Sequence, residues 1–152
     1  MIGVDNRRGF QMDIVTPDKR SAMMAGIRSK NTRPEIAVRR AAHGLGYRFR
    51  LHRSDLPGHP DIVFPKLKKI VLVHGCFWHR HLECRYAYSP KSKTNFWEAK
   101  FARTIERDSR NIEKLEKLGW RLLTIWECET FDSDALKKRL KEFLRGPRSQ
   151  NS

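Results

Sequence analysis

The sequence predicts one α/β domain in which a mixed sheet is flanked by helices. Short apolar runs typical of buried strands alternate with longer segments whose apolar residues recur every three or four positions. At 152 residues the length is typical of one compact domain, and a hydrophobic content of 39% is sufficient for its core. We expect a flexible arm over residues 1–15, the folded domain over 16–145 and a disordered tail over 146–152.

Two helices and an exposed strand are expected in the first third of the chain. Thr16-Pro17 places an N-cap residue before a proline at the first helical position, so a helix should begin there. Thr32-Arg33-Pro34-Glu35 has the form of a capping box and should open a second helix. Residues 47–51 alternate apolar and basic side chains, as a half-exposed strand does.

Three more strands and two more helices should follow. Residues 61–64 and 70–73 are apolar runs whose short connection suits a hairpin. The longest helix should follow residue 93, with an apolar face from Trp97 through Ile105 to Leu115. Residues 120–126 read as the last strand, and an amphipathic helix should start at residue 132 or 133.

The charge of the chain indicates a polyanionic partner. Lys and Arg number 32 against 17 Asp and Glu, which gives a net charge of +15 and favours DNA or RNA. Ribosomal proteins and membrane-surface proteins share such a charge, so it indicates no activity by itself. The sequence has no apolar run long enough to span a membrane and no signal-peptide core, so we expect a cytoplasmic, nucleoid-associated protein.

A cysteine and histidine pattern after the 70–73 strand predicts a metal site. The four candidate ligands include every cysteine of the chain: Cys76, His81, Cys84 and Cys128. Three cysteines and one histidine form a set that holds structural zinc, and four protein ligands leave no open position for catalysis. His79 or His59 could replace His81, and reduced core cysteines beside solvent-facing histidines are the alternative to a metal site.

A second group of polar residues predicts a catalytic site. If the hairpin forms, Asp61 at the head of one strand lies near His74 at the end of the next, and a carboxylate beside a backbone carbonyl suits Mg²⁺. His79 is a candidate general base, because the unperturbed pKa of histidine lies near neutrality. Asp108 falls on the apolar face of the longest helix, where a carboxylate needs a partner. We expect it to orient a histidine ring; a salt bridge with a neighbouring arginine is the alternative.

Several longer motifs form a pattern that a known family shares. They are Ile27-Arg28-Ser29-Lys30-Asn31-Thr32-Arg33-Pro34-Glu35, Leu56-Pro57-Gly58-His59-Pro60-Asp61, His74-Gly75-Cys76-Phe77-Trp78-His79-Arg80-His81, Phe96-Trp97, Glu106-Arg107-Asp108, Leu118-Gly119-Trp120-Arg121 and Ile125-Trp126-Glu127-Cys128. This combination resembles the very short patch repair (Vsr) DNA mismatch endonucleases over about residues 16–145. The resemblance implies a fold related to type II restriction endonucleases, a structural zinc and Mg²⁺-dependent nicking of DNA. The implied target is a T:G mismatch produced by deamination of 5-methylcytosine.

The resemblance also implies roles for individual residues. Asp61 and the main-chain carbonyl of Val73 would bind Mg²⁺, although the family pattern known to us has Thr where Val73 stands. His79 would activate the attacking water while Asp108 orients its ring, and His74 would contact the region of the scissile phosphate. The same resemblance assigns the zinc to Cys76, His81, Cys84 and Cys128. Two residues separate His81 from Cys84, where the family pattern has one.

The remaining implied roles concern Glu35 and the contacts with DNA. Glu35 would complete the catalytic site, or it would only stabilise a helix as the third residue of the capping box. The aromatic residues that match the family's wedge into the duplex are Phe77, Trp78 and Trp97. Trp97 also begins the apolar helix face, so core packing is its alternative role. The helix with Met24 and Ile27 would grip the opposite groove.

The resemblance implies partners as well, and two other functions stay open. We expect a monomer that acts on double-stranded DNA with a T:G mismatch and is linked functionally to a cytosine-5 DNA methyltransferase and to repair proteins. One alternative is a zinc-stabilised protein that binds DNA lesions without cleaving them. Another is a related nuclease with a different DNA target. The positions of Asp61, His79 and Asp108 favour the enzyme.

Overall fold

The computed structural model describes residues 31–146, and residues 34–146 belong to one compact unit. The elements in chain order are α2 (Arg33–Gly44), β1 (Arg50–Leu51), β2 (Ile62–Phe64), the 3-10 turn η2 (Pro65–Leu67), β3 (Lys69–His74), α3 (Thr94–Lys117), β4 (Arg121–Trp126), the 3-10 turn η3 (Glu127–Thr130) and α4 (Ser133–Arg145). This order confirms the predicted one from the second helix onward. The predicted first helix with Met24 and Ile27, the predicted arm and all of the predicted tail after residue 146 lie outside the described residues, so the predicted domain bounds stay predictions.

The strands form one mixed sheet in the order β1-β2-β3-β4. The predicted hairpin is confirmed, because β2 and β3 pair antiparallel, as do β1 and β2. β3 and β4 pair in parallel along their whole length, from Lys69 opposite Arg121 to His74 opposite Trp126. The segments that leave β3 and β4 therefore begin at the same edge of the sheet.

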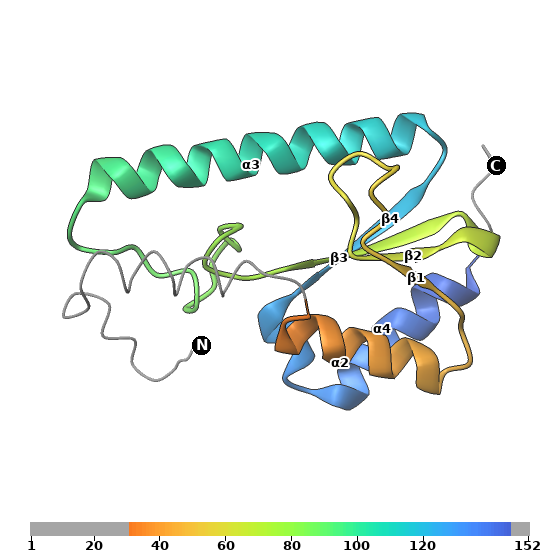
Figure 1. Cartoon of the computed structure of the whole chain (residues 1–152). Coiled ribbons are helices and arrows are strands. Elements are labelled where there is room, and N and C mark those ends of the chain that lie inside the picture. Colours follow the sequence, from red (N-terminus) through yellow and green to blue (C-terminus); the bar gives the residue numbers. More distant parts are fainter. Residues whose placement is uncertain (1–30, 147–152) are drawn as a thin grey trace. The chain divides into compact units, whose positions relative to one another are not determined.

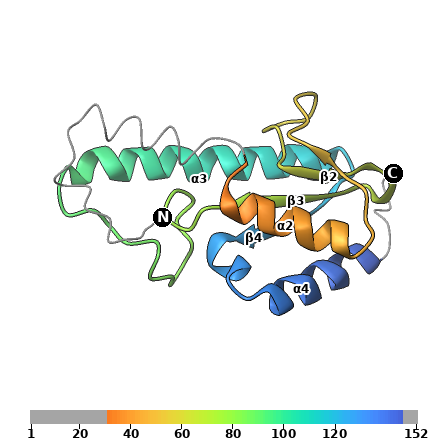
Figure 2. The ribbon, with the colours of Figure 1, turned by 60° about the horizontal axis from the view of Figure 1, so that its bottom comes forward.

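Helices cover both faces of this sheet: α3 lies on one face, and α2 and α4 lie on the other (Figures 1 and 2). Alternate strand residues serve the two faces. Ile62 and Phe64 join the core with α2 and α4, whereas Val63 and Ile70 join a second core with Leu115 of α3. Two-sided cover explains why β2 is buried at every position.

The strand predicted over residues 47–51 is shorter in the structure. Only Arg50 and Leu51 pair with β2. Tyr47 and Phe49 instead pack edge-on against Phe64, with ring centroids 6.4 and 5.9 Å apart. The alternation of apolar residues thus indicated that Tyr47 and Phe49 pack inward, but both are only half-buried, Leu51 is 40% exposed, and the backbone before Arg50 is not in the sheet.

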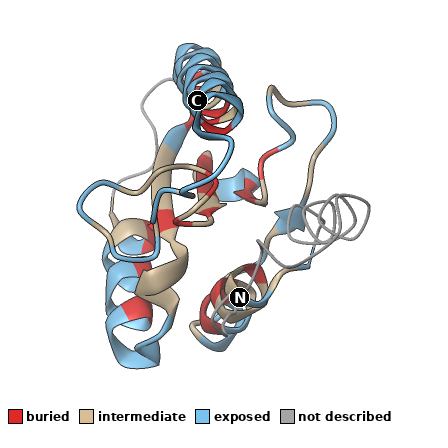
Figure 3. Ribbon diagram, turned by 90° about the vertical axis from the view of Figure 1, so that its left-hand side faces the viewer, coloured by how far each residue is buried: buried red, intermediate tan, exposed pale blue. Residues whose placement is uncertain are grey.

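The buried stripe of α3 differs from the predicted one at a single turn. Ile105 is 47% exposed, whereas Thr104 is buried and donates its hydroxyl to the Lys100 carbonyl at 3.1 Å. The buried residues step by three from Phe101 to Thr104, so Ile105 lies at the edge of the stripe. Most of α3 is exposed (Figure 3). Among residues 31–146, no helix has both the length and the apolarity that crossing a membrane requires.

A buried lysine joins the sheet to the end of α4. Lys69 is fully buried, and its Nζ donates to the carbonyls of Phe143, Leu144 and Gly146 at 2.7, 3.3 and 2.9 Å. The last carbonyls of a helix have no partner within the helix, and a cation at that end also interacts well with the helix dipole. Burial lowers the pKa of Lys69. The side chain acts as the C-terminal cap of α4.

Lys69→Met should therefore lower the free energy of unfolding by about 2 kcal/mol or more, because it leaves buried carbonyls without a donor. The measurement is urea unfolding followed by circular dichroism. Lys66→Met is the matched control, since Lys66 is exposed and should tolerate the change within about 0.5 kcal/mol. Equal effects of the two substitutions would contradict the capping role.

Candidate active site and metal centre

The predicted metal ligands meet at the edge where β3 and β4 end. Each of Cys76, His81, Cys84 and Cys128 places one ligand atom within 4.8 Å of the others. His81 Nδ1 lies 3.7 Å from Cys76 Sγ and 3.5 Å from Cys128 Sγ. Among the described residues, neither His79 nor His59 belongs to this cluster, so the structure assembles the preferred ligand set.

The distances in this cluster fit a tetrahedral metal. Bonds of about 2.3 Å from zinc to sulfur and about 2.0 Å to nitrogen place ligating sulfur and nitrogen atoms roughly 3.5 Å apart. The Cys128 N–H donates to Cys76 Sγ at 3.4 Å, a contact that stabilises negative charge on sulfur. Burial raises the pKa of the Cys76 and Cys128 thiols, and a bound cation would reverse that preference. The donor set could therefore hold a divalent metal.

Two histidines and an aspartate form a second cluster beside the first. The rings of His74 and His79 stack with centroids 4.0 Å apart and planes 8° apart. His79 Nδ1 lies 2.5 Å from Asp108 Oδ2 on α3. If the Nδ1–H donates to this carboxylate, the other ring nitrogen, Nε2, keeps its lone pair and can accept a proton. Asp108 thus contacts a histidine, as predicted, while the nearby Arg110 pairs with Glu106 at 3.8 Å.

His74 is held in its neutral form. Burial, followed by the adjacent His79, lowers the pKa of His74 to about 3. A neutral ring can stack on its neighbour without opposing a positive charge on that neighbour. His74 can therefore act as a neutral hydrogen-bonding group beside His79.

A third cluster collects carboxylates at the start of β2. Asp61 Oδ2 accepts from the Val73 N–H at 2.9 Å. Glu35 Oε1 accepts from Arg39 at 3.0 Å and lies 3.2 Å from His52 Nε2. Glu35, His52 and Asp61 each place a ligand atom within 4.8 Å of the others. The Glu35 carboxylate thus reaches the predicted catalytic region.

The environment of Asp61 joins the second and third clusters. Burial raises its pKa to about 6, and the Glu35 charge adds to this rise. The Val73 N–H opposes the rise most, and the charges of His52 and His79 oppose it further. The charge of His79 is thus among the influences on the pKa of Asp61, so the second and third clusters lie close enough to interact electrostatically.

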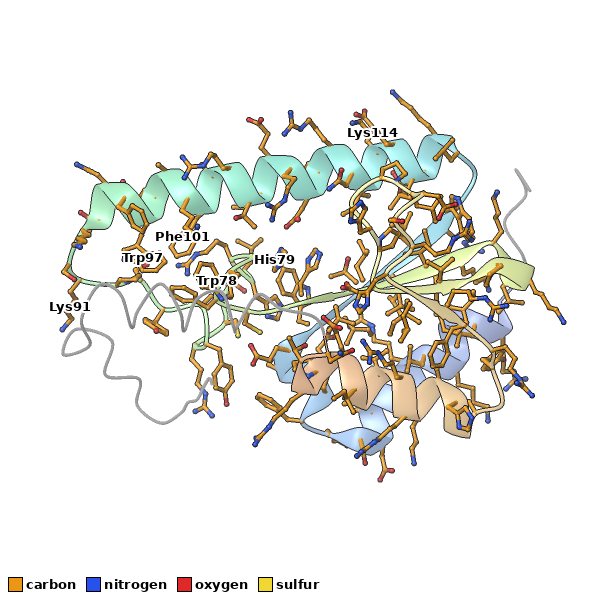
Figure 4. The ribbon with its side chains drawn as sticks, viewed as in Figure 1. Trp78, His79, Lys91, Trp97, Phe101 and Lys114 are labelled. Carbon is orange, nitrogen blue, oxygen red and sulfur yellow. The ribbon has the colours of Figure 1, made fainter. Side chains whose placement is uncertain are left out.

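The three aromatic residues predicted to contact DNA also lie together. Phe77 contacts Trp78, Trp97 and Phe101 at ring centroid distances of 5.1, 5.4 and 5.2 Å. Trp78, Trp97 and Phe101 gather beneath the N-terminal half of α3, with His79 beside them (Figure 4). Trp97 is only 2% exposed, so it has the packing role that its helical position also allowed. Phe77 is half-buried.

Two residues that the sequence analysis passed over support these clusters. The Arg80 guanidinium lies over the Phe101 ring at 4.0 Å and donates to the carbonyls of Phe77, Ala87 and Tyr88 at 3.2, 2.9 and 3.0 Å. It therefore fixes the loop around the aromatic residues. His52 contacts Glu35 from the segment after β1. No sequence spacing distinguishes either residue, because both act through contacts between distant segments.

Comparison with known proteins identifies the family. A family model described as DNA mismatch endonuclease Vsr matches residues 12–85. A type II nicking enzyme of Xanthomonas oryzae pv. oryzae is 49% identical over 132 residues, which cover 87% of this chain and 96% of that protein. The chain belongs to the Vsr family. A nicking enzyme of Neisseria meningitidis is 41% identical over 133 residues (88% of this chain, 94% of that protein). The DNA mismatch endonuclease Vsr of Escherichia coli is 37% identical over 139 residues, 88% of each chain.

Membership of the Vsr family confirms the resemblance predicted from the motifs. It also confirms the predicted class of activity, that of a DNA mismatch endonuclease. DNA is thus the substrate of this enzyme. In this Vsr-family chain, the clusters around Asp61, His79 and Cys76 are three groups of side chains that could each hold a metal ion.

The raised pKa of Asp61 predicts a pH-dependent gain in stability when the charge is removed. The pKa is about 6 in the folded protein, and unfolded aspartate has a pKa near 4, so ionisation of Asp61 opposes folding as the pH rises between these values. Without added divalent cations, Asp61→Asn should raise the unfolding free energy above that of the wild type. This gain should be about 2 kcal/mol larger at pH 8 than at pH 4.5.

Urea unfolding between pH 4.5 and pH 8 measures this gain. Asp55→Asn is the control, because Asp55 is exposed and its ion pair with Arg53 lowers its pKa. A gain for Asp61→Asn that is the same at both ends of the pH range would contradict the electrostatic explanation.

Proposed function

We propose that this protein nicks one strand of double-stranded DNA beside a T:G mismatch, the product of deaminated 5-methylcytosine, with Mg²⁺ as the catalytic cation. The observation that carries the proposal is the assembly of Asp61 and Val73 beside the His79–Asp108 pair. A general base next to a site for a hard cation suits phosphodiester hydrolysis, whereas binding to a lesion requires neither. The related endonuclease and nicking enzymes support cleavage as well.

In this proposal Asp61 and the main-chain carbonyl of Val73 hold Mg²⁺. The Val73 N–H points to Asp61, and the N–H and C=O of one residue in an extended strand face the same neighbour. The carbonyl therefore faces the Asp61 side, and two oxygen donors suit a cation that keeps several waters. Bound Mg²⁺ would polarise the phosphate and lower the pKa of water.

His79 and Asp108 carry out the proton transfer in this proposal, and His74 lies beside them. His79 accepts the proton from the attacking water at Nε2, while Asp108 holds the Nδ1–H and stabilises the imidazolium that results. His74 stays neutral against the charged ring and contacts the scissile phosphate region. Glu35 completes the site from α2, since its carboxylate lies with Asp61.

The cysteine and histidine cluster holds structural Zn²⁺ in this proposal. The donor atoms and their separations suit zinc, and four protein ligands would leave the ion no open position for water. The ion would join the loop after β3 to the turn after β4. It would thereby fix the loop that contains His79 and Phe77.

The aromatic cluster forms the wedge that enters the duplex. Phe77 is half-buried, and Trp78 and Trp97 pack against it and support its ring. Inserting apolar side chains costs a few kcal/mol of unstacking, and a mispaired step opens more easily than a matched one. Met24 and Ile27 would contact the opposite groove; both lie outside the described residues. We further propose a nucleoid-associated monomer linked to a cytosine-5 DNA methyltransferase.

A panel of duplexes tests the function. Each duplex contains one T:G mismatch in a different flanking sequence and is incubated with the enzyme and Mg²⁺. We expect one strand to be nicked in a subset of flanking sequences and no nick in the matched T:A duplexes. Asp61→Asn should reduce the nicking rate at least about 10³-fold and keep DNA binding, because it removes the charge that holds the cation.

Two controls make this test decisive. Asp55→Asn removes an exposed carboxylate and should nick at the wild-type rate. The proposal fails if no mismatched duplex is nicked although the wild-type protein binds DNA. Full activity of Asp61→Asn would remove the proposed metal role of Asp61.

The zinc proposal has its own measurement. Elemental analysis of the purified protein should find one zinc per chain, and Cys128→Ser should lower the zinc content and the melting temperature together, because metal binding contributes to folding. His59→Gln is the control, since His59 lies outside the cysteine cluster. A folded wild-type protein without zinc would refute the assignment.

A further inference from the structure

His52 has an unusual backbone for a residue with a bulky side chain. Its φ is +45°, in the left-handed region where a side chain other than glycine is strained by about 1 kcal/mol or more. Its N–H donates to the Asp61 carbonyl at 3.2 Å, which extends the pairing of β1 with β2. Such strain persists where surrounding contacts fix it, and it gathers at functional sites. Here the contact that fixes the backbone is made with Asp61.

The ring of His52 lies against the second carboxylate of the site. His52 Nε2 is 3.2 Å from Glu35 Oε1, and both side chains are largely buried, with 14% and 9% exposure. Arg39 contacts the same oxygen at 3.0 Å, but Arg39 belongs to α2, as Glu35 does. Arg39 can therefore fix the Glu35 rotamer but cannot relate α2 to the sheet. His52 touches Glu35 with its ring and Asp61 with its backbone, so it connects the two.

The two carboxylates need such a connection. Glu35 and Asp61 place oxygens within 4.8 Å of each other and of a ring nitrogen of His52 in a largely buried site. Like charges at this separation repel, and weak screening in the interior strengthens the repulsion. A hydrogen-bond donor between helix and sheet holds the pair together, and partners of this kind commonly change metal affinity or activity 10- to 100-fold when removed.

We propose that His52 is a positioning residue of the cleavage site, whose imidazole holds the Glu35 carboxylate beside Asp61 so that both face the catalytic cation. This inference rests on the proposed function, because it assigns His52 a role at the proposed Mg²⁺ site. It extends that function to a residue that acts through Glu35 and Asp61 and does not touch the DNA itself.

Three substitutions at His52 separate the ring from the backbone. Asparagine tolerates the left-handed conformation, but its amide nitrogen corresponds to Nδ1 and falls short of Glu35. The longer glutamine amide reaches the position of Nε2 and can donate there. Alanine removes the donor and is strained in this conformation as well. His59→Ala is the matched control, because His59 is exposed and has nearly the same φ of +47°.

The readouts are the nicking rate at saturating Mg²⁺, the Mg²⁺ concentration for half-maximal nicking, and Mn²⁺ binding followed by electron paramagnetic resonance. We expect His52→Asn and His52→Ala to raise the half-maximal Mg²⁺ concentration about tenfold and to weaken Mn²⁺ binding similarly. His52→Gln should recover most of the affinity, and His59→Ala should match the wild type.

Three results would overturn the inference: wild-type metal dependence in His52→Asn, equal losses in His52→Ala and His59→Ala, or no recovery in His52→Gln. The metal titration also separates this inference from the proposed function. If the wild type nicks no T:G duplex, the proposed function fails, and Mn²⁺ binding still decides the role of His52. If the wild type nicks and His52→Asn binds Mn²⁺ equally well, the function stands and the inference fails.

Discussion

The parallel pairing of β3 with β4 is the interaction on which the site depends. It aligns His74 with Trp126 at the last pair, so the chain leaves both strands at one edge. Cys128 follows Trp126 by two residues and meets Cys76, which follows His74 by two residues. The His81 ring stacks on Trp126 at 4.2 Å and completes the contact. An antiparallel pairing would place Cys128 at the far end of the sheet, and the ligand set could not form.

The loop after β3 contributes residues to two sites, because its backbone turns place His79 and His81 beside different neighbours. His79 N–H donates to the Gly75 carbonyl and His81 N–H to the Cys76 carbonyl, both at 3.1 Å. These bonds curl the loop so that His79 returns to stack on His74 and His81 returns to Cys76. The same number of residues separates His79 from His74 and His81 from Cys76, but the two histidines contact different neighbours. A single loop can thus hold a metal cluster and a proton-transfer pair without sharing a ligand.

How much of this could be predicted depends on the range of each interaction. Residue type and spacing were enough to predict the hairpin, the Cys76, His81 and Cys84 group and the place of Asp108 on the inner face of α3, because these patterns are local in the sequence. That Cys128 joins the group depends on the pairing of β3 with β4. The capping-box pattern at Glu35 is local too, but the contact of its carboxylate with His52 requires α2 to pack beside β1. Arg80 stands within one of the family motifs, but its contacts with Phe101 and the carbonyls of the loop come from tertiary packing. Neither role leaves a periodic signal in the sequence.

The carboxylates of the proposed site are opposite in sign to the net charge of the whole chain. A net charge of +15 attracts a polyanion, yet Asp61, Glu35 and Asp108 place three carboxylates in the proposed cleavage region. A phosphate would be repelled by ionised carboxylates there, and burial already disfavours the charge on Asp61. A divalent cation removes both penalties, because it stabilises the carboxylates and attracts the phosphate. In the proposed mechanism, basic surface residues bind the DNA, and the cation allows one phosphate to approach the carboxylates. Cleavage then requires the site together with its cation, and DNA binding alone is not sufficient.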